Sequence, residues 1–422
     1  MNLISSKNMK DIIVKTLEIV NKEIIRHGQV TSYILYKMLE HEHMYTDQET
    51  IDYVMIGMLH DIGLYRDYSV KNITKFEFNN LWAHSIYGFL FLKYLSPLSN
   101  KAELVLYHHL DYSLAKNILS TPKLNHVLEC LSLADKMDTY MHMDGEEMGS
   151  DYFTRYRDIK FSGKALDLFT QANHDFHIMD NLSNGTYLEE INELFSKRSF
   201  PEQYKRSFLE MLIYTIDFRS EHTVVHTMST VNFADQIGRL MHLNAGELYN
   251  LHYGAMLHDL GKIAIPLEIL ESTGRLSKEE FRVMKAHVQI TEIILKDIID
   301  EDVLQIAIRH HEKLDGSGYH HGLSEKDLTL PQQIVAVADI LSALYGKRSY
   351  KDSFDPELIK KILGEDAENG KINKNAVNTV LTNYDSIITT YEKEKQNMLG
   401  LYWEIKKDYE TIILKFKKFD KK

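Results

Sequence analysis

The sequence predicts an almost entirely helical protein in which one domain is duplicated along the 422 residues. Apolar residues recur every three or four positions over long segments, which is the spacing of a buried helix face. The alternation typical of strands is hard to find, and the chain has only 20 glycines and 6 prolines. Histidines and aspartates recur in the same order in the two halves, which indicates a duplication.

Taken in chain order, the expected helices are separated by short turn-rich segments. SPLSN near residue 96 and LSNGT near residue 182 interrupt the first half, and DGSGYHHGLSEKD begins at residue 315. The clearest helical periodicity lies in three segments of the second half: residues 223–241, 279–295 and 331–345.

The last long segment, residues 391–416, carries apolar and aromatic residues at helical spacing. We expect a C-terminal helix that packs on the core, with a dimer contact as the alternative use. The expected organisation is therefore a first domain over residues 1–180, a connector over 181–204, a second domain over 205–390 and a C-terminal helix over 391–422.

Composition restricts the class of protein. Apolar residues make up 44% and charged residues 26%, as in folded globular proteins. The formal charge of −12 argues against binding to duplex nucleic acid but allows a small anionic ligand at a local basic patch. Cys130 is the single cysteine, so an internal disulfide framework is excluded. With no bilayer-length apolar run and no secretory signal, we expect a cytoplasmic protein and no membrane partner.

Two ordered series of histidines and aspartates carry the chemistry. HDIG begins at residue 60 and HDLG at residue 258, and other members fall at similar offsets around each pair. His174-Asp175 is a third pair without such a series, which shows how a lone pair arises by chance. The candidate ligands of the first half are His27, His60, Asp61, His84, His108, His109 and Asp135, and those of the second are His226, His258, Asp259, His287, His310, His311 and Asp339.

Imidazoles and carboxylates are ligands that first-row metals accept, and seven side chains suit two ions with a shared ligand. Asp259 is the expected bridge, because a carboxylate has two oxygens whereas an imidazole cannot bridge in this way. His258 would then bind one ion and the His310-His311 pair the other. Two ions about 4 Å apart would activate a water and stabilise an in-line displacement at phosphorus. The alternative is a set of histidines that merely satisfy polar positions, and the recurrence of the order argues against it.

The second half resembles the HD-GYP family of bacterial cyclic-dinucleotide phosphodiesterases, a branch of the HD superfamily of metal-dependent phosphohydrolases. The resemblance rests on HDLGKIAIPLEIL, KAH, HHEKLDGSGYHHGL and VADILSALYGKRSYK and extends over about residues 205–385. It implies all-α, tandem HD-domain helical bundles. It further implies two or three iron or manganese ions, and hydrolysis of cyclic di-GMP or cyclic GMP-AMP to linear products by a metal-bridging hydroxide.

Matching positions imply individual roles. Asp259 would be shared between one ion held with His226, His258 and Asp339, and another held with His287, His310 and His311. Lys262, four residues after His258 and so on the same face if the helix continues, resembles a lysine near the scissile phosphate; it could instead complement a helix dipole. The remaining matches concern substrate contacts. Gly318 and Tyr319 would lie in a covering loop or, alternatively, in a plain glycine-rich turn. Arg348 and Lys351 would be phosphate-binding cations or, alternatively, a surface charge pair.

Three positions depart from the family pattern. His320 replaces the proline after Gly-Tyr, which relaxes the backbone and adds a titratable group at the pocket mouth. Ser342 replaces the second aspartate of a DxxD pattern. His222 stands where some members carry a glutamate tied to a third metal, so a third ion is left open.

The first half retains all seven candidate ligands but lacks the groups expected to handle a phosphodiester. Leu64 replaces the lysine, HHLDYSLAK replaces the Gly-Tyr loop, and Asp144 and Glu147 stand at the positions of the two cations. Acidic groups there would repel phosphate. We interpret this half as a divergent HD domain that does not cleave cyclic dinucleotides, with regulation, dimer formation or hydrolysis of another phosphoester left open.

The leading hypothesis is a cytoplasmic phosphodiesterase with its active site in the second half. The alternatives are a catalytically weak receptor for cyclic dinucleotides and an HD phosphohydrolase that acts on another phosphoester. The sequence does not distinguish iron from manganese or cyclic di-GMP from cyclic GMP-AMP, and a homodimer is left open.

Overall fold

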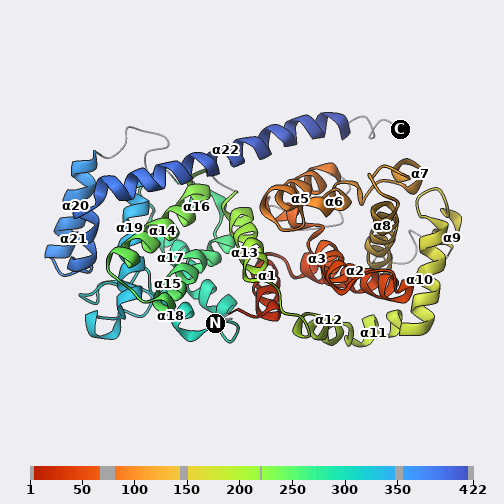
Figure 1. Ribbon diagram of the computed structural model, residues 1–422, viewed down its shortest axis with the longest axis horizontal. Helices are drawn as coiled ribbons and strands as arrows, with labels where there is room; N and C mark the ends of the chain where they lie inside the picture. The colour runs from red at the N-terminus through yellow and green to blue at the C-terminus, as the bar shows by residue number, and fades with distance from the viewer. Residues whose placement is uncertain are drawn as a thin grey trace. The chain divides into compact units, whose positions relative to one another are not determined.

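The computed structural model describes residues 4–66, 81–142, 151–218, 221–272, 274–346 and 355–416, without the side chains of residues 81, 142 and 221–224. The described residues form helices and no β-strand (Figure 1). The prediction of an all-α fold is therefore confirmed.

The chain divides into two compact units. The N-terminal unit comprises Ser5–Lys10, Leu17–Met211 and Ile405–Lys422, and the C-terminal unit comprises Met1–Ile4, Asp11–Thr16 and Leu212–Glu404. Residues 181–204, which we expected to be a connector, lie within the N-terminal unit and form most of α11 and all of α12.

Each unit is a bundle of helices, coloured in Figure 1 by position in the chain. The longer elements of the N-terminal unit are α2 (Lys22–Glu42), α3 (Asp47–Leu59), η1 (Ile62–Arg66), α5 (Leu81–Leu95), α6 (Glu103–Tyr107), α8 (Pro122–His142), α10 (Gly163–Phe176), α11 (Ile178–Asn184) and α12 (Tyr187–Ser196). Those of the C-terminal unit are α14 (Glu221–Leu240), α15 (Ala245–Leu257), η3 (Leu260–Ala264), α17 (Lys278–Leu295), α18 (Glu301–Ile308), α19 (Leu330–Gly346), α20 (Pro356–Glu368) and α21 (Lys374–Thr382). Three helices contain residues of both units: α1 (Ser6–Val20), α13 (Glu202–Asp217) and α22 (Tyr384–Phe416).

The duplication is visible in the packing of the helices. In the N-terminal unit α2 packs on α3 and α8, and η1 packs on α5. In the C-terminal unit α14 packs on α15 and α19, and η3 packs on α17. Helices α3 and α15 even begin alike, each with a capping box in which the N-cap side chain and a glutamate three residues later satisfy backbone N–H groups.

Helix α22 buries one face, as its periodicity predicts. Within the C-terminal unit the Tyr391 ring lies 4.8 Å from the ring of Phe233, and Tyr402 lies 4.8 Å from Phe218. Trp403 is 52% exposed on another face of the helix.

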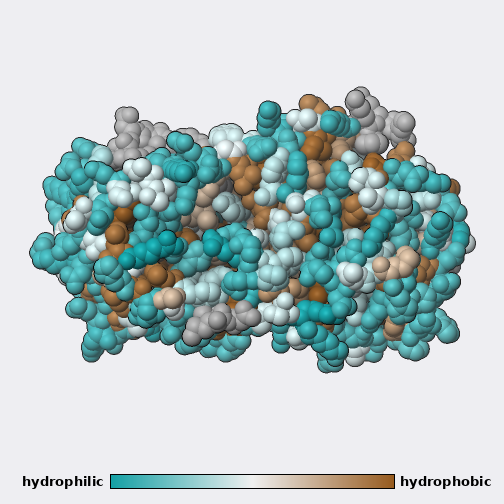
Figure 2. Space-filling view, viewed as in Figure 1, coloured by the Kyte–Doolittle hydropathy of each residue, from teal (hydrophilic) through white to brown (hydrophobic). Residues whose placement is uncertain are grey.

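Figure 2 shows mainly hydrophilic residues on the visible face of the molecule. Among the described helices none has the length and apolarity required to traverse a lipid bilayer.

Candidate metal centres

The His-Asp pairs stand where a helix ends. Helix α15 ends at Leu257, and the 3-10 helix η3 starts after Asp259. The helix therefore does not continue, and the condition under which Lys262 would share an α-helical face with His258 is not met. A 3-10 helix has three residues per turn, so Lys262 aligns with Asp259, and its Nζ lies 2.5 Å from Asp259 Oδ2.

The glycine of each HDxG sequence permits a close approach. A Cβ at Gly261 would lie 2.0 Å from the carbonyl oxygen of His287, and one at Gly63 would lie 2.0 Å from that of His84. Both distances are far below van der Waals contact. Glycine is therefore required for the 3-10 helix to rest on the helix that carries the next histidine.

In the C-terminal centre the two oxygens of Asp259 face different imidazoles. Asp259 Oδ2 lies 3.0 Å from His258 Nε2 and 3.4 Å from His226 Nε2, whereas Oδ1 lies 3.4 Å from His287 Nε2. His226 Nε2 also lies 3.1 Å from Asp339 Oδ1. The carboxylate thus joins two groups of side chains, as expected of a bridging ligand.

The remaining histidines complete the second group. His287 Nε2 lies 3.3 Å from His310 Nε2, and the ring centroid of His311 lies 4.0 Å from that of His310. His311 Nδ1 lies 3.6 Å from Asp339 Oδ2. All seven predicted residues of this half therefore come together.

Backbone carbonyls orient three of these imidazoles. The Nδ1 atoms of His258, His287 and His310 each lie 2.7 Å from the carbonyl oxygen three residues earlier. A carbonyl only accepts, so each Nδ1 carries the proton and donates it. When the imidazole is neutral, its Nε2 is then left with a lone pair, which is the form that ligates a metal.

Electrostatics favour a cation in this centre. Burial lowers the pKa of His258, but the carboxylates of Asp259 and Asp339 outweigh burial and raise that pKa to about 10. Burial instead lowers the pKa of His287 to about 4 and that of His311 to about 3, although Asp259 and Asp339 oppose it. The carboxylates thus attract positive charge while two imidazoles are held neutral, a combination that suits a metal ion.

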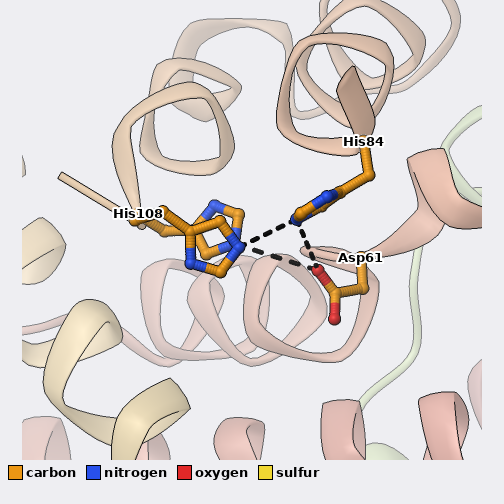
Figure 3. A group of neighbouring side chains, drawn as sticks. Asp61, His84 and His108 are labelled. Carbon is orange, nitrogen blue, oxygen red and sulfur yellow. Dashed lines mark hydrogen bonds and ion pairs between the residues drawn. The ribbon is translucent and has the colours of Figure 1, made fainter. Parts of the chain in front are cut away.

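The N-terminal centre repeats this arrangement around Asp61, and Figure 3 shows Asp61 with His84 and His108. Asp61 Oδ1 lies 3.4 Å from His84 Nε2 and 3.8 Å from His108 Nε2, and Asp61 Oδ2 lies 3.4 Å from His60 Nε2. His27 Nε2 lies 3.1 Å from Asp135 Oδ1. With His109, whose Nε2 lies 2.8 Å from His84 Nε2, all seven predicted residues of the first half converge as well.

Unsatisfied atoms show that both donor sets fit metal ions. Among the described residues of the two centres, four buried carboxylate oxygens make no hydrogen bond: both of Asp61, Oδ2 of Asp135 and Oδ1 of Asp259. The Nε2 atom of His108 is likewise buried without a hydrogen bond. Buried polar atoms without hydrogen bonds are costly, and a divalent ion would satisfy them.

The partner that orients the first histidine differs between the centres. His27 Nδ1 lies 2.7 Å from the carboxylate of Asp138, which also binds the guanidinium of Arg26. His226 Nδ1 lies 2.8 Å from the hydroxyl of Ser342 at the equivalent position. The first half thus retains the DxxD pattern that the second half lacks.

Lys136 is a residue that comparison of the two halves missed. Its Nζ lies 3.1 Å from Asp135 Oδ2 and 3.4 Å from His109 Nδ1, and its side chain is 26% exposed. It directly follows a predicted ligand, so a search of the ligands' neighbours would have found it. The N-terminal centre therefore contains a lysine, although Leu64 replaces the one in the HDxG segment.

Asp217, near the end of α13, is a second missed residue. Burial raises the pKa of its carboxyl to about 7, a hydrogen bond with Thr227 lowers it, and the carboxylate of Asp259 raises it further. Asp217, Thr227 and Asp259 line one small cavity. No repeat or motif includes Asp217, so only the folded chain reveals it beside the centre.

The predicted loop lies against the C-terminal centre. Tyr319 donates its backbone N–H to the carbonyl of His311 at 3.1 Å, and the two rings lie 4.7 Å apart. A Cβ at Gly318 would lie 2.4 Å from the backbone nitrogen of Lys313, so only glycine fits this approach. Burial raises the pKa of Tyr319, and Asp339 and Asp259 raise it further, which keeps its hydroxyl protonated as a donor.

Several predicted residues cannot be placed. Arg348 and Lys351 lie outside the described residues, and so do Asp144 and Glu147. His222 lies in helix α14, but its side chain is outside the described part. Their roles stay predictions.

Comparison with known families and proteins gives matches over both units. Two models of the HD domain match the chain, one over residues 24–140 and the other over residues 210–372. The 3'3'-cGAMP-specific phosphodiesterase 1 of Vibrio cholerae is 23% identical over 400 residues, which is 88% of this chain and 90% of that protein. A cyclic di-GMP phosphodiesterase of Thermotoga maritima is 32% identical over 237 residues, 53% of this chain and 62% of that protein.

A solved structure with a similar fold is among the matches. It is that of the V. cholerae cyclic GMP-AMP specific phosphodiesterase V-cGAP3, with a TM-score of 0.53 and 16% identity. The match covers 90% of this chain and 98% of the other. At this identity the likeness concerns the fold.

Proposed function

Since this chain is a tandem HD-domain protein, we propose that its C-terminal unit is a metal-dependent phosphodiesterase that hydrolyses a cyclic dinucleotide to a linear product. The observation that carries the proposal is the placement of Asp259. Its two oxygens face two separate groups of imidazoles, as a two-ion phosphodiesterase centre requires. The relatives support the class of substrate, because they are named for cyclic GMP-AMP and cyclic di-GMP.

We assign the first ion to His226, His258, Asp259 and Asp339, and the second to Asp259, His287, His310 and His311. Imidazole and carboxylate ligands suit iron and manganese, so these two metals are the proposed cofactors. When bound, the ions supply a water of lowered pKa and stabilise negative charge at phosphorus.

Side chains around the two metal sites would position the substrate. Lys262, whose side chain is 17% exposed, offers an ammonium beside Asp259 that offsets charge developing on the phosphate without proton transfer. Tyr319 covers His311 and presents a protonated hydroxyl as a donor. Arg348 and Lys351 are proposed to bind the second phosphate.

The test is direct. The protein is purified without chelator, its metals are quantified, and cyclic di-GMP and cyclic GMP-AMP are followed by chromatography beside the Asp259→Ala variant. Turnover by the wild type and its loss in the variant are expected. Turnover that survives in the variant overturns the site, and tight binding without turnover favours a receptor.

Lys136 favours a second candidate function for the N-terminal centre. There an ammonium lies beside a complete set of predicted ligands, so we propose that this centre binds metal and a phosphoester of another class. The test is hydrolysis of p-nitrophenyl phosphate and binding of inorganic phosphate by the Asp259→Ala protein. When Lys136→Met is added to Asp259→Ala, we expect the loss of both the hydrolysis and the phosphate binding. An unchanged rate and an unchanged affinity for phosphate would contradict the assignment.

We further propose that the protein acts in the cytoplasm, because a single cysteine gives no disulfide framework.

We also propose a homodimer that forms through the exposed face of α22 that carries Trp403. Light scattering on Trp403→Glu tests it: a monomeric wild type overturns the dimer.

A further inference from the structure

A third cluster of ligand atoms lies outside both centres. Glu292 of α17 and the consecutive His320 and His321 each offer one ligand atom, and these atoms lie within 4.8 Å of one another. Both histidines are exposed, and Glu292 is half-buried. His320 is also one of the departures from the family pattern that the proposed reaction does not explain.

We propose that Glu292, His320 and His321 bind an accessory divalent cation of the zinc type. Two imidazoles and one carboxylate form a ligand set that zinc accepts in tetrahedral sites, with a water as the fourth ligand. Because the histidines are exposed, the site can exchange its ion with solvent, unlike the two buried centres.

The backbone on which the two histidines stand is already held in place. Glu312 accepts the N–H of His321 at 2.6 Å through Oε1 and the N–H of Leu323 at 2.9 Å through Oε2. Glu312 itself is buried. The segment would therefore lose little backbone freedom on binding an ion, which favours affinity.

The ion would brace two elements of the C-terminal centre. Glu292 is five residues after His287 on α17. His320 directly follows Tyr319, whose backbone and ring both contact His311. A cation at this site thus ties the loop to α17 and holds Tyr319 over His311. The binding step does not depend on the proposed hydrolysis.

The experiment counts bound zinc. Wild type and a His320→Gln/His321→Gln variant are dialysed to equilibrium against Zn²⁺, and metals are quantified by mass spectrometry. Glu292→Gln is tested beside Glu279→Gln, an exposed glutamate of the same helix. One zinc fewer per chain is expected in the double variant and in Glu292→Gln, and none fewer in Glu279→Gln.

Hydrogen exchange tests the brace. Zn²⁺ is expected to slow exchange of the amides of residues 316–323 about tenfold in the wild type and not in the double variant. Equal zinc content in wild type and double variant overturns the site. A zinc difference without slower exchange overturns the brace. Neither result depends on turnover, so failure here is distinct from failure of the phosphodiesterase proposal.

Discussion

Asp259 is the residue on which the C-terminal centre depends most. It provides one oxygen to each group of imidazoles and a partner for Lys262. Its neighbour His258 needs a cation or a proton beside the two carboxylates, as its raised pKa indicates. Removal of a single oxygen should therefore disturb both ions.

Asp259→Asn should remove at least one ion per chain and lower kcat about 10³-fold, because an amide cannot bridge two cations and the ions contribute several kcal/mol. Metal analysis and steady-state rates measure the effect. Asp175→Asn is the matched control, since His174-Asp175 is exposed and outside both centres. An unchanged metal content in Asp259→Asn would contradict the bridge.

Lys262→Met should lower kcat about 10²-fold with little change in metal content, because the ammonium acts on charge that develops during the reaction. Lys278→Met on the exposed start of α17 is the control. If Lys262→Met changed KM alone, the lysine would only bind the substrate.

Ser342 supports His226 with a hydroxyl, whereas Asp138 supports His27 with a carboxylate. Ser342→Ala should weaken metal binding at the C-terminal centre about 10-fold to 100-fold, because the imidazole loses its orienting partner. Ser342→Asp should strengthen it. Competition with a fluorescent chelator measures both, and equal affinities in all three proteins would contradict the role.

At the scale of elements, the join between α15 and η3 determines the geometry of the centre. The change from an α-helix to a 3-10 helix places Lys262 over Asp259, and the absence of a Cβ at Gly261 lets η3 rest on α17. The α3–η1 join, with Gly63, repeats this arrangement. Both halves thus use the same short element to bring a His-Asp pair to the next histidine helix.

Gly261→Ala should destabilise the C-terminal unit by about 1–3 kcal/mol, because the added methyl forces η3 away from α17. The midpoint of urea unfolding measures the effect. Gly364→Ala is the matched control: Gly364 lies in α20 with open space around it, and alanine there should stabilise by about 0.5–1 kcal/mol. If both variants shifted the midpoint equally, the close approach would not matter.

At the scale of the whole molecule, each unit encloses its own complete set of predicted ligands. Their buried carboxylate oxygens without hydrogen bonds make the metal-free protein less stable than it could be. Metal binding should therefore be linked to folding in both units.

Removal of metal by a chelator should lower Tm by about 5–10 °C, since an ion at one hundred times its Kd stabilises by about 2.7 kcal/mol. Differential scanning fluorimetry measures the shift, and added manganese should reverse it. In Asp259→Asn the part of the shift that belongs to the C-terminal unit should disappear. A Tm that does not respond to the chelator would contradict linkage.

Much of the site was predictable because the duplication orders the ligands along the chain. His27 through Asp135 and His226 through Asp339 recur at similar spacings, and all fourteen side chains converge as two sets. Local periodicity was enough to predict the all-α class, because a buried helix face requires apolar residues every three or four positions along the sequence. Whether the helix of His258 continues to Lys262 was left open, because the sequence does not show where α-helical hydrogen bonding gives way to 3-10 hydrogen bonding.

The sequence by itself determined which residues are available to bind metal and in what order they occur, because a repeat preserves order. Only the tertiary structure decided that Asp259 turns one oxygen to each group, that Asp217 lies beside the C-terminal centre, and that Glu292 meets His320 and His321. These contacts form between residues that lie far apart in the chain. They depend on how the helices pack, which the spacing of residues along the sequence does not specify.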